Sequence, residues 1–176
     1  MKIRMLFLTG VIAFFSSCDK DPKEVDLPFE VDMGKSIVYL NGKEVDYEPH
    51  IFLHKVYNHM NFPFVQKKGD ILNQVAFSWL PVKTGDFALH TERVQYVKAL
   101  TSFSQIVDED IEGYEYELES PDEGFFNIEG LDTVKLEVKG RFKAKFRRTS
   151  KNGHGNLGLP EVLLFQGIFN EKYEKR

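Results

Sequence analysis

Cys18 is the residue with the most specific chemistry, and it is the only cysteine of the 176-residue chain. It follows two basic residues, an apolar stretch at positions 5–15 and then two serines. A short basic and apolar segment that ends in small residues before a cysteine is typical of a bacterial lipoprotein signal. The sequence therefore predicts that residues 1–17 are a signal peptide and that Cys18 becomes the acylated first residue of the mature protein.

The alternative is an ordinary secretory signal followed by an incidental cysteine. The apolar stretch has 11 residues, whereas a membrane-spanning helix needs about 20, so it does not predict a permanent transmembrane anchor. Several acyl chains, palmitate among them, would attach the protein durably, because one chain alone gives only reversible membrane binding.

Residues 18–34 connect the predicted anchor to the rest of the chain. Charged residues and prolines dominate positions 19–28, and this composition favours an extended, solvated tether. Acidic residues directly behind a Ser-Ser-Cys site resemble lipoproteins of the Bacteroidota, in which they often accompany export to the outer face of the outer membrane. The resemblance implies a lipid-anchored outer-membrane protein exposed at the cell surface, with the periplasmic face as the alternative.

Three histidines, His50, His54 and His59, are the first candidates for a metal site. On a helix, His50 and His54 would have the spacing of paired zinc ligands. The local sequence favours strands instead, and no nearby carboxylate completes a ligand set. We therefore predict no metal and no cofactor, with the histidines exposed at the surface or partly buried.

The stretch 108–123 contains nine carboxylates. The spaced ligands and central glycine of a calcium loop are missing. Two carboxylates facing each other across a cleft could hydrolyse a glycosidic bond, which makes a hydrolase one functional alternative. The simpler hypothesis is a ladder of opposite charges across neighbouring strands. It would place Glu115, Glu117 and Glu119 beside Arg141, Lys143 and Lys145.

The segment 57–64 has an irregular pattern and is unusually aromatic. Loops bind partners more often than the scaffold does, and a proline-fixed aromatic loop could stack on a sugar or dock on a membrane protein. Tyr57, His59, Phe62 and Phe64 are therefore the candidate ligand- or partner-binding residues. In the favoured alternative, Phe62 and Phe64 pack beneath the fold, since exposed aromatic patches are rare.

Strand patterns dominate the elements that must position these residues. Asn41-Gly42 between two β-prone runs predicts a hairpin, and alternation over 135–147 predicts a half-buried antiparallel strand. Further strands are expected over 71–80, with Trp79 in the core, and over 161–170. The one candidate helix lies near 90–100, where an edge strand fits equally well, and the glycine-rich segment 153–158 is expected to be a hairpin loop.

These elements predict an all-β fold, an antiparallel β-sandwich or flattened barrel with at most one short helix. Residues 35–176 have the size of one domain. The order of motifs is similar to that of a family of small Bacteroidota outer-membrane lipoproteins with a β-rich domain of unknown function. The motifs are Asn-Gly-Lys at 41–43, Gly-Asp-Phe at 85–87, Gly-Tyr-Glu-Tyr at 113–116, Gly-Phe-Phe-Asn-Ile at 124–128, Gly-Arg-Phe at 140–142 and Gln-Gly-Ile-Phe at 166–169. This resemblance implies the fold and the envelope address and supplies no catalytic residues.

The net charge of −4 argues against nucleic acid as a partner. No Gly-x-Ser-x-Gly elbow is present, and the single cysteine is assigned to the lipid, so nucleophilic catalysis has little support. We therefore expect a non-enzymatic envelope lipoprotein that acts as an accessory subunit of an outer-membrane complex, through an outer-membrane protein partner. A glycan- or peptide-binding surface lipoprotein is the second hypothesis, and the hydrolase is the third.

Overall fold

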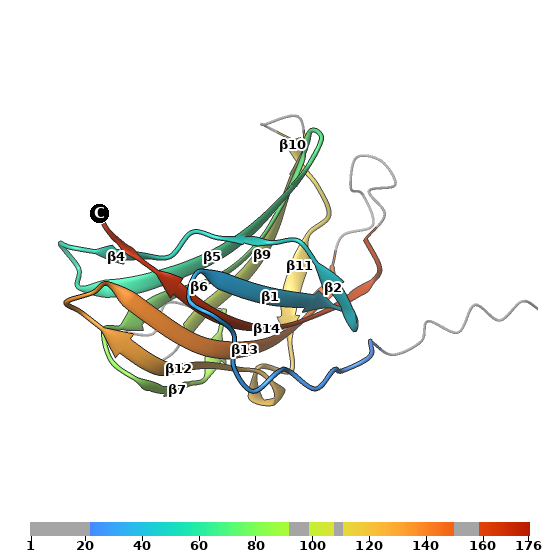
Figure 1. Cartoon of the computed structure of the whole chain (residues 1–176). Coiled ribbons are helices and arrows are strands. Elements are labelled where there is room, and N and C mark those ends of the chain that lie inside the picture. Colours follow the sequence, from blue (N-terminus) through green and yellow to red (C-terminus); the bar gives the residue numbers. More distant parts are fainter. Residues whose placement is uncertain (1–21, 92–98, 108–110, 150–158) are drawn as a thin grey trace, which may run out of the picture.

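Two packed β-sheets form the molecule, seen in a computed structural model that describes residues 22–91, 99–107, 111–149 and 159–176 (Figure 1). The first sheet, sheet A, has seven strands. They are β1 (Lys35–Leu40), β2 (Lys43–Val45), β7 (Gly85–Phe87), β11 (Tyr116–Glu119), β12 (Phe125–Asp132), β13 (Glu137–Arg148) and β14 (Val162–Lys172). Their order is β2-β1-β14-β13-β12-β7, and β11 also pairs with β13.

The second sheet, sheet B, has eight strands. They are β3 (Glu48–Pro49), β4 (Phe52–His54), β5 (His59–Lys68), β6 (Ile71–Pro81), β8 (Leu89–His90), β9 (Ala99–Val107), β10 (Ile111–Glu112) and β15 (Glu174–Lys175). Their order is β10-β9-β6-β5-β4-β15, with β3 on β5 and β8 on β9. All pairs are antiparallel except β4 with β15 and β8 with β9. The predicted antiparallel sandwich is confirmed, and the sheets do not close into a barrel.

Within the described residues the only helical element is the 3-10 turn η1, Pro121–Glu123. The candidate helix at 90–100 is not seen at its described ends, because His90 belongs to β8 and Ala99 begins β9. Positions 92–98 lie outside the described residues, as do Cys18 with the signal peptide, residues 108–110 and the whole glycine-rich segment 153–158. No helix in the described part is long and apolar enough to cross a membrane.

The hairpin prediction at Asn41-Gly42 is confirmed. β1 and β2 pair from Leu40 with Lys43 onward, and the two turn residues have φ angles of 51° and 80°. Positive φ at both central positions matches the right-handed twist of the strands, and asparagine and glycine accept it at the lowest cost.

The long alternating strand is also confirmed, as β13, which begins at Glu137 because Leu136 has a φ of 59°. Its inward residues, among them Phe142 and Phe146, are fully buried. They face aromatic side chains of sheet B across the sandwich. Ring centroids lie 4.7 Å apart for Phe64 and Phe142 and 4.7 Å apart for Phe62 and Phe126. A core of phenylalanines fills the space between the sheets without any disulfide.

The core prediction for Trp79 is wrong. Val75 and Phe77 are buried as expected, but the register of β5 and β6 shifts between Met60 and Phe62, and Trp79 has a φ of 63°. A bulge rotates the side chains that follow it. Trp79 is therefore half-buried at the end of the sandwich, and Leu80 takes its place in the core.

Strand β14 is buried on both of its faces. Leu163, Phe165 and Phe169 point into the sandwich, while Leu164 and Ile168 on the opposite face are each only 3% exposed. The residues that cover this outer face come from the N-terminal strap, which we define as residues 22–33. The strap has no regular secondary structure but lies across sheet A (Figure 1).

Candidate functional site

Four aromatic side chains meet at one end of the sandwich, in a group that we call the aromatic corner. They are His54, Tyr57, His59 and Trp79. His54 ends β4 and His59 begins β5, and the two residues pair directly across the hairpin. The turn between them contains Tyr57 and is closed by Asn58, whose φ is 49° and whose N–H donates to the carbonyl of His54 at 2.8 Å.

The rings of the corner stack from inside to outside. His59 lies 4.0 Å from Trp79 with 26° between the ring planes, and His54 lies 5.2 Å from His59 at 24°. Tyr57 covers the group, at 4.7 Å from His54 and 5.9 Å from Trp79 between centroids. Contacts of this kind add to the free energy of burial and fix the orientation of each ring.

Exposure divides the corner into a support and a contact surface. His59 is 2% exposed, whereas Tyr57 is 51% exposed and its neighbour Val56 is 80% exposed. The turn therefore presents an apolar surface to solvent while the buried histidine and Trp79 hold the tyrosine ring from behind. A ring held in this way loses little conformational entropy when a ligand packs on it.

Charged groups border the apolar surface. Arg176 lies over the ring of Phe52 at 4.8 Å and pairs with Glu174 at 3.0 Å. Its backbone carbonyl accepts a hydrogen bond from the N–H of Lys55, which joins the C-terminus to the turn. An apolar centre with a polar rim is the usual anatomy of a protein interface.

The structure divides the four residues predicted to bind a ligand into two pairs. Tyr57 and His59 come together in the corner, but Phe62 and Phe64 are fully buried between the sheets. The favoured alternative for these two phenylalanines is thus confirmed. The prediction of a loop over 57–64 is wrong from His59 onward, because those residues form β5.

Pro63 made this strand difficult to predict, because proline cannot donate a ladder hydrogen bond. In the structure the outer neighbour of β5 changes at this point, from β4 at residues 59–61 to β3 at 64–65. The carbonyl of Pro63 accepts from His50 at 2.8 Å on that side. The missing N–H therefore falls at the junction of two short strands, where no ladder donor is needed.

The three histidines do not form one group. His50 lies beside Glu48, with 3.9 Å between Nε2 and Oε2, while His54 and His59 stack in the corner. His59 is fully buried, deeper than the surface or partly buried position expected of the histidines. Among the described residues, no group of three or more histidine, cysteine or carboxylate side chains is arranged to hold a metal ion.

The hypothesis of a charge ladder is confirmed for one expected pair, Glu119 with Lys145, whereas Arg141 and Lys143 have other partners than those it named. Glu119 lies 3.3 Å from Lys145 and 2.6 Å from Arg147, on paired strands β11 and β13. Lys143 pairs instead with Glu24 of the strap at 2.7 Å, and Arg141 pairs with Glu129 at 2.7 Å. In the described part of the acidic stretch, the carboxylate of Glu119 is thus neutralised by Lys145 and Arg147.

Two glutamates in sheet A have pKa values shifted in opposite directions. Burial alone would raise the pKa of Glu119, but hydrogen bonds and charges from Arg147 and Lys145 outweigh it and hold the pKa below its usual value. Burial raises the pKa of Glu171, and the hydrogen bond from Ser36 at 2.8 Å only partly offsets this.

We expect these shifts to give opposite effects of pH on stability. A lowered folded-state pKa stabilises above the unfolded-state pKa, and the effect is lost as pH falls through the folded value. A raised pKa stabilises below the unfolded-state value, and the effect is lost as pH rises through the folded value. Glu119→Gln should therefore lower the free energy of unfolding at pH 7 by about 0.5–1 kcal/mol, while Glu171→Gln should leave it unchanged or raise it.

Urea denaturation of both variants at pH 7 and pH 4 measures this difference. The loss in Glu119→Gln should shrink at pH 4, because the carboxylate of the unfolded state is then partly protonated and folding must release that proton. The same sign of change for both variants at pH 7 would contradict the assignment.

A polar groove of about 710 Å³ opens between the edges of the two sheets, bordered by β1 and β2 on one side and by β3 and β5 on the other. Acidic side chains dominate its charged lining, and Lys35 and Lys67 also contribute. Its one aromatic residue, Tyr47, is buried, with its edge against Phe165. The groove thus offers no exposed ring for stacking a sugar, and the aromatic corner remains the stronger candidate.

Comparisons of the chain with protein-family models, with curated proteins and with solved structures found no significant match.

Proposed function

We propose that this protein is a non-enzymatic lipoprotein of the bacterial outer membrane that binds a protein partner through the aromatic corner, as an accessory subunit of an envelope complex. The observation that supports this most directly is the exposed Val56-Tyr57 surface, backed by stacked rings and bordered by charge. The anchor is Cys18, acylated after removal of residues 1–17, and the address is that of the Bacteroidota lipoproteins which the signal resembles.

Tyrosine in a rigid setting is a common centre of binding energy. Interfaces draw most of their affinity from a few aromatic or arginine residues surrounded by contacts that exclude water. Tyr57 meets this description, because its ring is half exposed and its position is fixed by His54 and Trp79. The surface projects from a turn and does not line a deep cavity, which favours a macromolecular partner over a small ligand.

Glycan binding is the second candidate. Sugar rings stack on exposed aromatic faces, and Tyr57 offers one. A hydrolase has weaker support, because Glu119 of the acidic stretch is neutralised by Lys145 and Arg147.

The test is capture of partners by the natively acylated protein from detergent-solubilised membranes, with wild type compared against Tyr57→Ala. We expect a stoichiometric membrane protein with the wild type, and a loss of affinity of about 30-fold in the variant, since central aromatic residues contribute about 2 kcal/mol. Phe29→Ala is the matched control, because Phe29 is an exposed aromatic residue on the strap, outside the corner.

Equal capture by wild type and Tyr57→Ala would contradict the proposed site. No protein capture, together with glycan binding that Tyr57→Ala abolishes, would favour the second candidate.

A further inference from the structure

The strap is attached to sheet A along most of its length. The side chain of Gln166 on β14 both accepts from the N–H of Val25, at 2.9 Å, and donates to its carbonyl, at 3.2 Å. Farther along, Asn170 donates to the carbonyl of Val31 at 3.0 Å, and Arg141 donates to the carbonyl of Phe29. Residues 22–33 are thus part of the folded domain.

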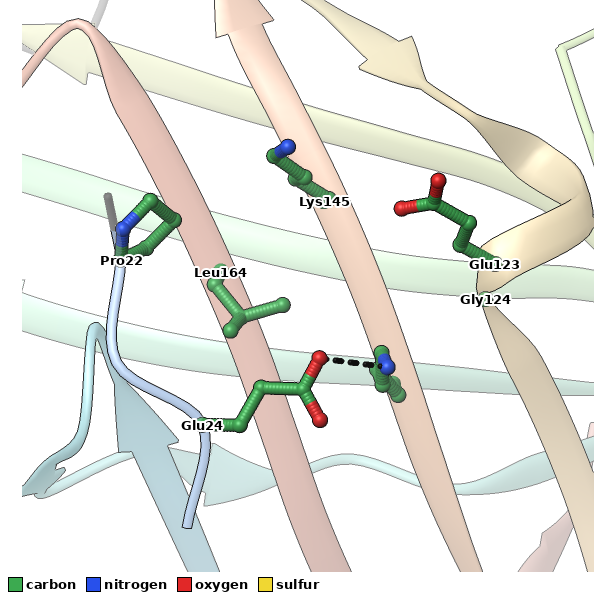
Figure 2. Close-up of a pocket in the computed structure, with 7 residues that line it drawn as sticks. Pro22, Glu24, Glu123, Gly124, Lys145 and Leu164 are labelled. Atoms are coloured by element: carbon green, nitrogen blue, oxygen red, sulfur yellow. Dashed lines mark hydrogen bonds and ion pairs between the residues drawn. The ribbon is translucent and has the colours of Figure 1, made fainter.

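The strap has a defined direction over the sheet. Its first residues, Pro22 and Glu24, lie over Leu164, and the carboxylate of Glu24 pairs with the Lys143 ammonium (Figure 2). The strap ends where the N–H of Gly34 donates to the carbonyl of Asn170 at 2.7 Å. It therefore runs along β14 from near the start of that strand to near its end.

The aromatic corner lies beyond the far end of this path. After Tyr173 the chain enters β15, whose Glu174 pairs with Phe52 of β4, and β4 leads into the corner. Figure 1 shows the turn after β4 at the end of the sandwich opposite the end where the strap enters. The eight residue steps from Leu164 to Lys172 alone span about 27 Å at the usual rise of a strand.

The length of chain before the strap is short. Cys18 and Pro22 are four residues apart, which allows at most about 14 Å of extended chain. A free tether of residues 18–34 would allow about 55 Å and any orientation of the domain. Binding of the strap to sheet A thus shortens the connection to the anchor several-fold.

We infer that the strap orients the domain on the membrane, with the Pro22 end beside the bilayer and the aromatic corner directed away from it. The inference rests on the lipid anchor of the proposed function and extends it. The partner of the corner is then a protein surface that stands well clear of the anchoring bilayer, not the bilayer itself. Charge on the strap and sheet, including Glu24 and Lys143, keeps the near end polar.

The test uses the full acylated protein in vesicles of phosphatidylethanolamine and phosphatidylglycerol that contain a headgroup-nitroxide lipid as a contact quencher. A fluorophore is placed through Lys43→Cys at the near end or through Val134→Cys at the far end. Both side chains are exposed, and a Cβ on Gly42, next to position 43, would lie 2.9 Å from the backbone oxygen of Lys23 of the strap. We expect loss of fluorescence at position 43 and little loss at position 134.

The intact mass of the protein, measured first, tests the lipid anchor separately from the orientation of the domain. An unmodified Cys18 would overturn the proposed anchor and the orientation with it. An acylated protein that is quenched equally at both positions, or more strongly at position 134, would overturn the orientation and leave the anchor and the corner standing. A third variant, Val134→Cys combined with Gln166→Leu, should be quenched more than Val134→Cys alone, because the released strap lengthens the tether.

Discussion

Gly140→Ala is expected to destabilise the protein by about 3 kcal/mol, as an overpacked core position does. A Cβ at this position would lie 2.0 Å from the backbone oxygen of Asn127 and 2.8 Å from Cζ of Phe169. The oxygen belongs to the paired strand β12 and cannot move without breaking the ladder. In a domain of this size the change corresponds to a fall in the melting temperature of about 6–12 °C, measurable by circular dichroism.

Gly130→Ala is the matched control within the same sheet. There the nearest atoms to a new Cβ belong to the flexible side chain of Lys139, at 3.0 Å, which can swing aside. We expect a change of no more than about 0.5 kcal/mol, as at ordinary surface positions. Similar melting temperatures for the two variants would show that the close approach at Gly140 does not limit packing.

The same geometry explains two of the glycine- and phenylalanine-containing motifs of the sequence. Gly-Arg-Phe at 140–142 and Gly-Ile-Phe at 167–169 lie on neighbouring antiparallel strands, β13 and β14. Gly140 faces Phe169, and Phe142 faces Gly167. Each phenylalanine ring occupies the space above the opposite glycine, with Phe142 only 2.4 Å from where a Cβ on Gly167 would be. Each glycine therefore makes room for an aromatic ring of the core.

Local patterns predicted most of the fold because their causes are local. The turn at Asn41-Gly42 follows from residues that accept positive φ, and β13 follows from strict alternation along one strand. The predictions at Trp79 and Pro63 were wrong for the opposite reason, because the structure there has causes that are not local. The bulge near Met60 and the change of neighbour along β5 depend on residues far apart in the sequence.

The sequence predicted two of the four residues of the aromatic corner as binding residues. Their place in an aromatic segment predicts Tyr57 and His59 as binding residues, and both lie in the corner. The sequence pattern suggests His54 only as a metal ligand and predicts Trp79 only as a core residue. The stacking of His59 on Trp79 depends on the bulged pairing of β5 with β6, and nothing in the local sequence indicates it.

The sequence did not predict that the strap binds sheet A, because its charged residues and prolines are typical of a solvated segment. The indication of a covering segment lies in the sequence of β14 instead. Residues 162–169 are apolar or small apart from Gln166, and a strand with no alternation is buried on both faces. The run indicated that something covers the outer face of β14, although it could not say which segment does so.

Release of the strap is the second large effect that we expect, and Gln166→Leu should produce it. Gln166 is 6% exposed and makes both hydrogen bonds to the backbone of Val25. Leucine keeps the apolar contact but leaves the N–H and carbonyl of Val25 without these partners. Each unsatisfied group of this kind costs about 1–3 kcal/mol. A loss of about 1.4 kcal/mol corresponds to a tenfold change in an equilibrium constant and about 2.8 kcal/mol to a hundredfold change. Exchange of the Val25 amide should therefore accelerate by about 10- to 100-fold.

Hydrogen exchange measured by NMR compares the Val25 amide with that of Gly34 in one experiment. The Gly34 N–H donates to the backbone of Asn170 and does not depend on the Gln166 side chain, so it should change much less. Glu24→Gln is the control variant, because it removes only the exposed ion pair to Lys143, which contributes little. Unchanged exchange at Val25 in Gln166→Leu would mean that apolar contacts with Leu164 and Ile168 hold the strap without the amide clamp. Acceleration throughout the strap, with unchanged exchange in the strands of sheet A, would show that the strap opens as a unit while the sandwich beneath it stays folded.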